Sequence, residues 1–261
     1  MPGASNIIHV NGIDINVVES GSGFTTLIFL HYWGGSSATW EDTIGELART
    51  HRCIAVDLRG WGASSKGDID YSLDAMADDV VALINKLDLR DYILVGHSMG
   101  GKIAQIVATR QPDGLKGLAL VAPAPPTPLP TPQEMRDQML AALETREGTH
   151  AVIPMLAAKP FGEKSLQTFV ESSLVGDSRA RRAWCETGMD YDLTGDVGKV
   201  IVPIRIIVGT KDGIEPEASL RASFDKFYPG TDYAVLEGVG HMSPLEAPAE
   251  LAEAIRHAAF A

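Results

Sequence analysis

The chain has 261 residues, of which 45% are hydrophobic, and its formal net charge at pH 7 is −12. This length fits one large domain, or one domain with an insertion, and it is ample for a buried core. The negative charge argues against binding to nucleic acid or to an anionic membrane, because both repel an acidic protein. The apolar runs, such as 118–122, are far shorter than the roughly 20 residues that span a bilayer.

The cysteines and the N-terminal residues indicate in which cell compartment the protein resides. Cys53 and Cys185 lie far apart in the sequence and suggest neither a disulfide framework nor a metal site. The first ten residues lack the basic start and long apolar stretch of a secretory signal. We therefore expect a cytoplasmic protein with reduced thiols. Because no metal cluster or nucleotide motif stands in the sequence, we also expect no metal and no cofactor.

Short apolar strands alternate with helical patterns along the first half of the chain. The Asn11-Gly12 pair predicts a hairpin over residues 7–20. Further strands are predicted at 26–32, 53–58, 92–97 and 118–124, and helices at 40–50, at 72–87 and after Ser98. Strands that are apolar on both faces belong to a sheet covered on both sides. The alternation therefore predicts the α/β fold class, with a mostly parallel sheet flanked by helices.

A run of six prolines between residues 123 and 132 ends this alternation, because proline continues neither a strand nor a helix. Helical patterns without strands follow. Strands return at 202–210 and 233–238, and a closing helix is predicted over 248–260. We therefore predict a core domain of residues 1–123 and 195–261, and a helical insertion of residues 124–194.

The stretch VGHSMGG, residues 95–101, places one serine between glycines where a strand gives way to a helix. In a G-x-S-x-G turn of this kind the serine hydroxyl protrudes above the sheet edge, and the helix N-terminus favours developing negative charge. Ser98 is therefore predicted to be a nucleophile. The alternative is a serine that only caps the helix.

A serine hydroxyl needs a base, and the base needs an orienting acid. His241 lies on a glycine-flanked loop after the last predicted strand and is our candidate base. Asp212 follows the strand IRIIVG and is the candidate acid, with Glu215 as the fallback. The chain order serine, acid, histidine agrees with this assignment. The other histidines weighed for the role are expected to be structural or solvated, or at most to touch substrate: His9, His51, His97, His150 and His257.

An oxyanion needs two N–H donors. The backbone of Met99, directly after the nucleophile, is predicted to supply one. The second is expected from residues 31–40, where Gly34 and Gly35 allow a tight bend.

Five motifs in this order and spacing resemble the α/β-hydrolase superfamily: LHYWGGSSATW, VDLRGWGAS, VGHSMGG, VGTKD and GVGHMSPLEAP. The resemblance implies an eight-stranded, mostly parallel sheet with a helical cap over the site. It also implies Ser98 as nucleophile, Asp212 as acid and His241 as base.

The resemblance further implies that Trp33 supplies the second oxyanion N–H. Tyr32 replaces the usual glycine of the family, so its phenol either enters the pocket as a hydrogen-bond donor or packs. We name Tyr32 and Trp184, a cap aromatic, as candidate substrate contacts. By the same resemblance, Asp57 and Arg59 belong to a structural carboxylate and a turn of the family and are not catalytic groups.

The leading hypothesis is a serine hydrolase that cleaves a small, fairly apolar ester or lactone through an acyl-enzyme. The same triad also serves carbon–carbon hydrolysis, perhydrolysis, and cofactor-free lyase or oxygenase chemistry, and fold does not separate these. A third hypothesis is a ligand receptor on a hydrolase scaffold. The expected partner is a small molecule, and the sequence leaves open whether the protein is a monomer or a homodimer.

Overall fold

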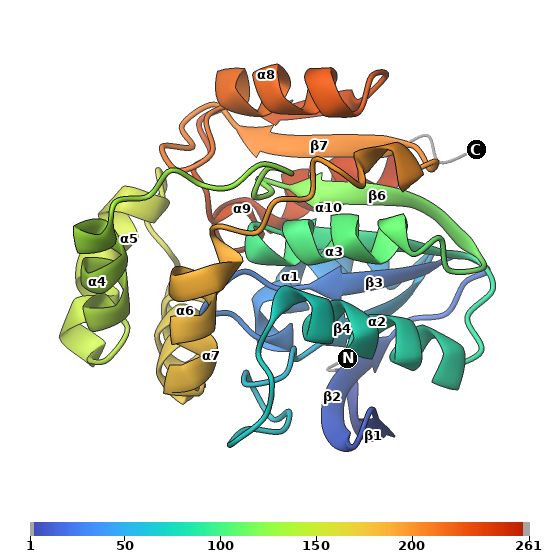
Figure 1. The fold of residues 1–261 in the computed structure, drawn as a ribbon, viewed down its shortest axis with the longest axis horizontal. Helices are drawn as coiled ribbons and strands as arrows, with labels where there is room; N and C mark the ends of the chain where they lie inside the picture. The colour runs from blue at the N-terminus through green and yellow to red at the C-terminus, as the bar shows by residue number, and fades with distance from the viewer. Residues whose placement is uncertain (1–2, 258–261) are drawn as a thin grey trace.

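The computed structural model describes residues 3–257 and shows an eight-stranded sheet in the order β1-β2-β4-β3-β5-β6-β7-β8 (Figure 1). β2 pairs antiparallel with β1 and β4, and all other neighbours are parallel. The predicted fold class is therefore confirmed. The strands are β1 (Ala4–Val10), β2 (Ile13–Ser20), β3 (Thr26–Leu30), β4 (Arg52–Val56), β5 (Tyr92–His97), β6 (Leu115–Val121), β7 (Ile204–Gly209) and β8 (Asp232–Leu236).

The predicted hairpin turns where expected. Val10 pairs with Ile13 across the two-residue loop, in which Asn11 has φ 50° and Gly12 has φ 78°. Both values lie in the left-handed region, which glycine and asparagine tolerate best.

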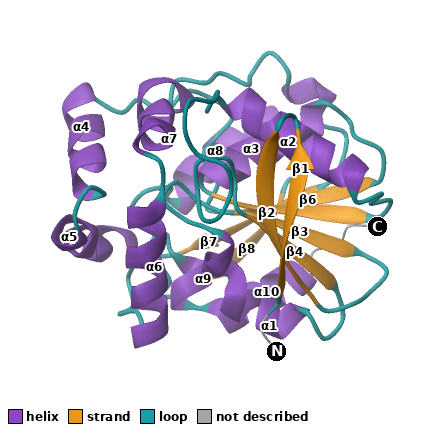
Figure 2. Cartoon of the chain, turned by 90° about the horizontal axis from the view of Figure 1, so that it is seen from below, coloured by secondary structure: helices purple, strands orange, loops and turns teal. Residues whose placement is uncertain are grey.

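Helices cover both faces of the sheet. One face packs against α2 (Leu73–Lys86), α3 (Met99–Thr109) and α8 (Glu217–Phe227), and the other against α1 (Glu41–Leu47) and α10 (Pro248–Arg256) (Figure 2). Ser72 caps α2 by accepting a hydrogen bond from the backbone N–H of Ala75, 3.2 Å away. The sequence pattern did not reveal α8 or the short α9 (Ser243–Glu246). The last three residues of the predicted closing helix, 258–260, lie outside the described residues.

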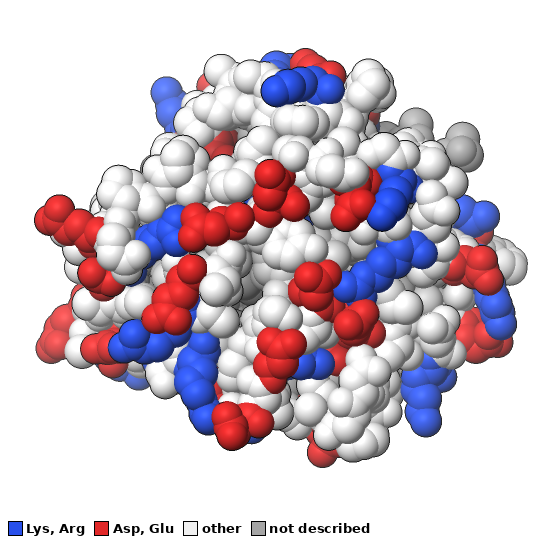
Figure 3. Space-filling model, in the orientation of Figure 1, with Lys and Arg blue, Asp and Glu red and all other residues white. Residues whose placement is uncertain are grey.

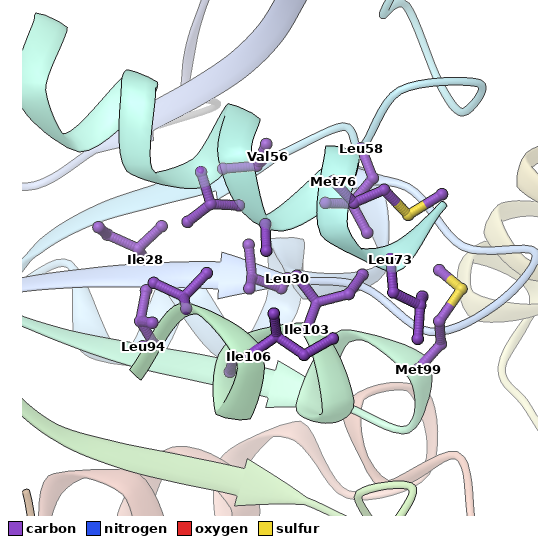
Figure 4. Packing of buried hydrophobic residues seen from close by; sticks show 14 of the residues in the cluster. Ile28, Leu30, Val56, Leu58, Leu73, Met76, Leu94, Met99, Ile103 and Ile106 are labelled. Carbon is purple, nitrogen blue, oxygen red and sulfur yellow. The ribbon is translucent and has the colours of Figure 1, made fainter. Parts of the chain in front are cut away.

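The core between β3, α2 and α3 holds the turn at Ser98 in place. Figure 4 shows Leu30 of β3 beside Ile103 of α3, and Met99 of α3 beside Leu73 of α2, with Met76 of α2 in the same cluster. All five side chains are at most 3% exposed. Because interiors of this kind are close-packed, the start of α3 has little freedom to move relative to the sheet.

Four helices lie together beyond the carboxyl ends of the parallel strands (Figures 1 and 2). They are α4 (Gln133–Ala142), α5 (Arg146–Leu156), α6 (Glu163–Val175) and α7 (Ser178–Ala183), which a π-helical turn, Trp184–Gly188, extends. They all fall within residues 124–194, which we call the cap segment.

Charged side chains of both signs are interspersed on the face shown in Figure 3. No large region of one sign dominates that face, despite the net charge of −12. Within residues 3–257, none of the helices has the length and apolar character needed to cross a membrane.

Candidate active site

Ser98 occupies a strained turn between β5 and α3, with φ 54° and ψ −116°. A non-glycine residue in such a conformation costs on the order of 1–3 kcal/mol and is typical of functional sites. The serine side chain makes no capping hydrogen bond to α3, which argues against the helix-cap interpretation. A Cβ at Gly100 would lie 2.3 Å from the carbonyl oxygen of Leu30, so the turn packs directly on β3 and requires a glycine there.

Asp212 and His241 form a buried hydrogen-bonded pair. Asp212 follows β7, and His241 follows β8, the neighbouring strand. His241 Nδ1 lies 2.9 Å from Asp212 Oδ2, and the two residues are 4% and 6% exposed. Asp212 Oδ1 accepts hydrogen bonds from the backbone N–H groups of Ile214 and Glu215, each at 2.8 Å. The structure therefore pairs the imidazole with Asp212 and not with Glu215.

This pairing sets the protonation of the imidazole. Burial opposes the charged form of His241, but the Asp212 carboxylate, through its charge and its hydrogen bond, outweighs burial and raises the pKa of His241 above the usual histidine value. Glu246 contributes in the same direction. Because Nδ1 is engaged by Asp212, Nε2 is the nitrogen available to a reacting group.

The His241 loop lies against the nucleophile turn. His97 Nε2 is 2.9 Å from the backbone oxygen of His241, and the two ring centroids are 5.1 Å apart. Burial lowers the pKa of His97 well below its usual value, so this ring is neutral and supports the loop as a hydrogen-bond donor. Among residues 3–257, neither Ser98 Oγ nor His241 Nε2 has a hydrogen-bond partner, so these two atoms are not hydrogen-bonded to each other and both are open to a substrate.

The two backbone groups expected to bind an oxyanion are also unused. Within the described part of the chain, the N–H groups of Met99 and Trp33 make no hydrogen bond. Met99 begins α3, where the helix dipole favours an anion. Trp33 lies in the loop after β3, in a tight turn in which the Gly35 N–H donates a hydrogen bond to the backbone oxygen of Tyr32, 2.9 Å away. Both predicted oxyanion donors are thus unpaired, as that role requires.

Asp57 connects the loop after β3 to two other segments of the core. Its carboxylate accepts hydrogen bonds from Ser37 N at 2.6 Å, Ala63 N at 2.8 Å and Asn16 Nδ2 at 2.9 Å. A Cβ at Gly62 would lie 2.1 Å from the same carboxylate, which explains the glycine there.

Arg59 pairs with Asp79 through Nε at 2.6 Å and Nη2 at 2.7 Å. Asp57 and Arg59 therefore both serve the framework of the site.

The sequence reasoning missed Glu246. Its carboxylate accepts hydrogen bonds from four backbone N–H groups, at Gly240, Met242, Ala158 and Lys159, over 2.8–3.0 Å. The first two flank His241 and the other two follow α5. Glu246 therefore ties the histidine loop to the cap segment. Its place five residues after His241 was visible in the sequence, but its partners more than eighty residues away were not.

The two candidate substrate contacts lie in packed surroundings. The ring of Tyr32 is stacked on Phe169 of α6 at a centroid distance of 6.2 Å and is 5% exposed. Its enclosed hydroxyl has no hydrogen-bond partner among the described residues. Trp184 is also 5% exposed and belongs to the same core cluster as Met99. For both residues, contact with substrate stays a proposal.

In the described part of the chain, no group of three or more His, Cys, Asp or Glu side chains is arranged to hold a metal ion.

Comparisons with known proteins agree with this architecture. The profile of the family described as "alpha/beta hydrolase fold" matches residues 25–248. The chain is 27% identical over 261 aligned residues to the pimeloyl-(acyl-carrier protein) methyl ester esterase of Aeromonas hydrophila subsp. hydrophila, covering 94% of this chain and 99% of that one. It is also 27% identical over 232 residues to the non-heme chloroperoxidase of Streptomyces lividans, covering 82% and 84%. The esterase EaEST of Exiguobacterium antarcticum superposes with a TM-score of 0.87 at 25% identity, covering 97% of this chain and 98% of that one. The chain therefore belongs to the alpha/beta hydrolase fold family.

Proposed function

We propose that this enzyme is a serine hydrolase that cleaves a small, fairly apolar carboxylic ester or lactone. The observation that carries the proposal is the buried pair of His241 and Asp212 beside the strained turn of Ser98. A serine, a histidine and a carboxylate that follow parallel strands of one sheet supply the nucleophile, base and acid of an acyl transfer. The unused N–H groups of Met99 and Trp33 supply the oxyanion donors that such a reaction needs.

The proposed reaction has two steps. His241 Nε2 takes the proton of Ser98 Oγ as the oxygen attacks the ester carbonyl, and the N–H groups of Met99 and Trp33 bind the resulting oxyanion. His241 then donates that proton to the leaving alcohol, which leaves an acyl-Ser98. A water molecule deprotonated by His241 releases the acid and regenerates the serine. Asp212 holds the ring and stabilises the transient imidazolium throughout.

We also propose that the cap segment covers the site and that the protein is cytoplasmic. Residues 124–194 would close over Ser98 and exclude water, with residues 1–123 and 195–261 as the core. Both cysteines are free and buried, which suits a reducing cytoplasm. Tyr32 and Trp184 would border the substrate from the core and the cap, respectively.

Perhydrolysis is the second candidate, because one relative is named a non-heme chloroperoxidase. It would use the same acyl-Ser98 and differ only in the second nucleophile, hydrogen peroxide in place of water. Peroxide-dependent formation of a peracid from a carboxylic acid distinguishes it from plain ester hydrolysis.

The test uses p-nitrophenyl acetate, butyrate and octanoate together with a fluorophosphonate label. We expect turnover and labelling in the wild type, and a loss of roughly 10⁴–10⁶ in kcat for Ser98→Ala and His241→Ala. Esterase activity that survives in both variants would contradict the mechanism. Labelling of Ser98 without turnover of any ester, lactone or peracid precursor would favour a receptor instead.

A further inference from the structure

Glu215 is a buried carboxyl group beside the triad that the proposed mechanism does not use. The residue is 8% exposed, and its backbone N–H donates to Asp212 Oδ1 at 2.8 Å. Within residues 3–257, the Glu215 side chain makes no hydrogen bond or ion pair, but the protein does not fully enclose its carboxyl oxygens. They therefore border space that water reaches. A carboxyl group that is largely buried, borders this space and has no partner among the described residues is free to bind a group that enters the space and displaces water.

The charged neighbours of this carboxyl come from three elements. His241 lies on the loop after β8, Asp212 lies on the same loop as Glu215, and Lys102 lies on α3, four residues after Ser98. Burial raises the pKa of Glu215 to about 8, an effect that Asp212 reinforces and that His241 and Lys102 oppose. At neutral pH the group is therefore mainly the neutral acid, which offers one O–H donor.

Lys102 does not satisfy Glu215. Its side chain is fully buried, and Nζ donates to the backbone oxygen of Thr127 at 2.9 Å. Among the described residues, no carboxylate lies within 4.0 Å of this ammonium group, although Glu215 is one of the charges that act on it. The lysine thus contributes positive charge at longer range and leaves the Glu215 hydroxyl free.

We propose that Glu215 is a specificity-determining residue whose carboxyl group binds a second oxygen of the substrate. This oxygen is a hydrogen-bond acceptor, of an ether, ketone or hydroxyl group, close to the ester carbonyl. The inference rests on the proposed esterase function and refines it: the preferred substrate is largely apolar but carries one such acceptor. A site built to bind an acceptor rejects the hydrocarbon analogue strongly, because its own polar group is then left unpaired.

Two pairs of esters that differ by one oxygen test this. On the acyl side they are p-nitrophenyl methoxyacetate and p-nitrophenyl butyrate; on the alcohol side, 2-methoxyethyl acetate and n-butyl acetate. For one of the pairs we expect the ratio of kcat/KM, ether over hydrocarbon, to fall about tenfold in Glu215→Leu. In Glu215→Gln, which keeps a donor, the ratio should stay within about threefold of wild type.

The pH provides a second readout that does not depend on the leucine variant folding. As the pH rises through about 8, Glu215 ionises and loses its donor, so the wild-type ratio should fall. The Glu215→Gln ratio should stay flat over the same range. Burial lowers the pKa of Lys102 to about 8, so this lysine titrates in the same range. Because Glu215→Gln keeps both Lys102 and His241, a flat ratio in that variant assigns the wild-type change to Glu215.

The outcomes separate the two proposals. An unchanged ratio in Glu215→Leu for both pairs, or a wild-type ratio that does not vary with pH, overturns the inference while the esterase function stands. An equal loss on all four esters also overturns it, because Glu215 would then only position the triad. If the wild type hydrolyses none of the esters and takes no fluorophosphonate label, the proposed function itself fails.

Discussion

The indole Nε1 of Trp33 donates a hydrogen bond to the backbone oxygen of Arg181 at 3.2 Å. This contact joins the loop after β3 to α7, so the residue whose backbone N–H we propose as an oxyanion donor is held by the cap segment. A displacement of the cap would therefore shift the proposed oxyanion hole directly.

Trp33→Phe removes this hydrogen bond but keeps the backbone N–H and an aromatic ring. We expect about 1 kcal/mol less free energy of unfolding and a several-fold loss of kcat, because the donor is less well fixed. Urea unfolding and ester kinetics measure the two effects. Trp40→Phe is the control, since the Trp40 indole N–H has no acceptor among the described residues. Equal kcat values for wild type and Trp33→Phe would show that the cap contact does not position the donor.

Replacing Ser98 by glycine or by alanine separates catalysis from strain. Both variants lack Oγ and should lose activity equally. Only glycine relaxes at φ 54°, so Ser98→Gly should unfold at a higher denaturant concentration than Ser98→Ala, by about 1 kcal/mol. If alanine proves the more stable replacement, the turn is not strained in solution.

In the proposed mechanism His241 acts as a base and must be neutral, so the pH dependence of kcat/KM should report on this residue. Because Asp212 raises the pKa of His241, activity should fall on acidification with a midpoint above the ordinary histidine value of about 6.5. Asp212→Asn should move that midpoint to lower pH and reduce kcat by roughly 10⁴. An acid limb that stays in place in Asp212→Asn would indicate that another group controls it.

Glu246→Gln tests the link between the histidine loop and the cap. An amide has one acceptor oxygen and turns its NH₂ group towards N–H donors, so part of the four-bond arrangement is lost. We expect a loss of about 1–3 kcal/mol in stability, measured by thermal unfolding, together with lower kcat. Glu250→Gln is the matched control, because among residues 3–257 the Glu250 side chain makes only an exposed 3.9 Å contact with Lys159. Similar stabilities for the two variants would count against the bracing role of Glu246.

The buried Glu215 should also make stability pH-dependent. Its folded-state pKa, about 8, lies above the usual value of 4.5, so the folded protein holds a proton that the unfolded chain releases. The stability from this group is full below pH 4.5 and is lost as the pH rises towards 8. Glu215→Gln should therefore match the wild type near pH 4.5 and exceed it near pH 8.5, by on the order of a few kcal/mol. Parallel thermal unfolding curves at both pH values would rule out a buried neutral acid.

Local patterns determined much of this fold. Each predicted strand appears in the sheet, because continuous apolar runs between turn residues have few alternatives to a covered strand. The bounds of β6 differ by three residues from the prediction, because the strand begins at Leu115, which pairs with Tyr92 of β5, and ends at Val121. The helix α8 was missed because only Leu220 and Phe224 on it are buried, which leaves a weak apolar periodicity.

The sequence by itself determined which chemical groups the site contains: a serine in a glycine turn, a carboxylate after β7 and a histidine after β8. Only the tertiary structure decided how they are paired. Asp212, and not Glu215, reaches His241, although both stand on the same short loop. Glu246 and Trp33 bind backbone groups of a segment more than eighty residues away in the sequence. Hydrogen bonds of this kind depend on where backbone groups lie in space, and residue identity alone does not encode that position.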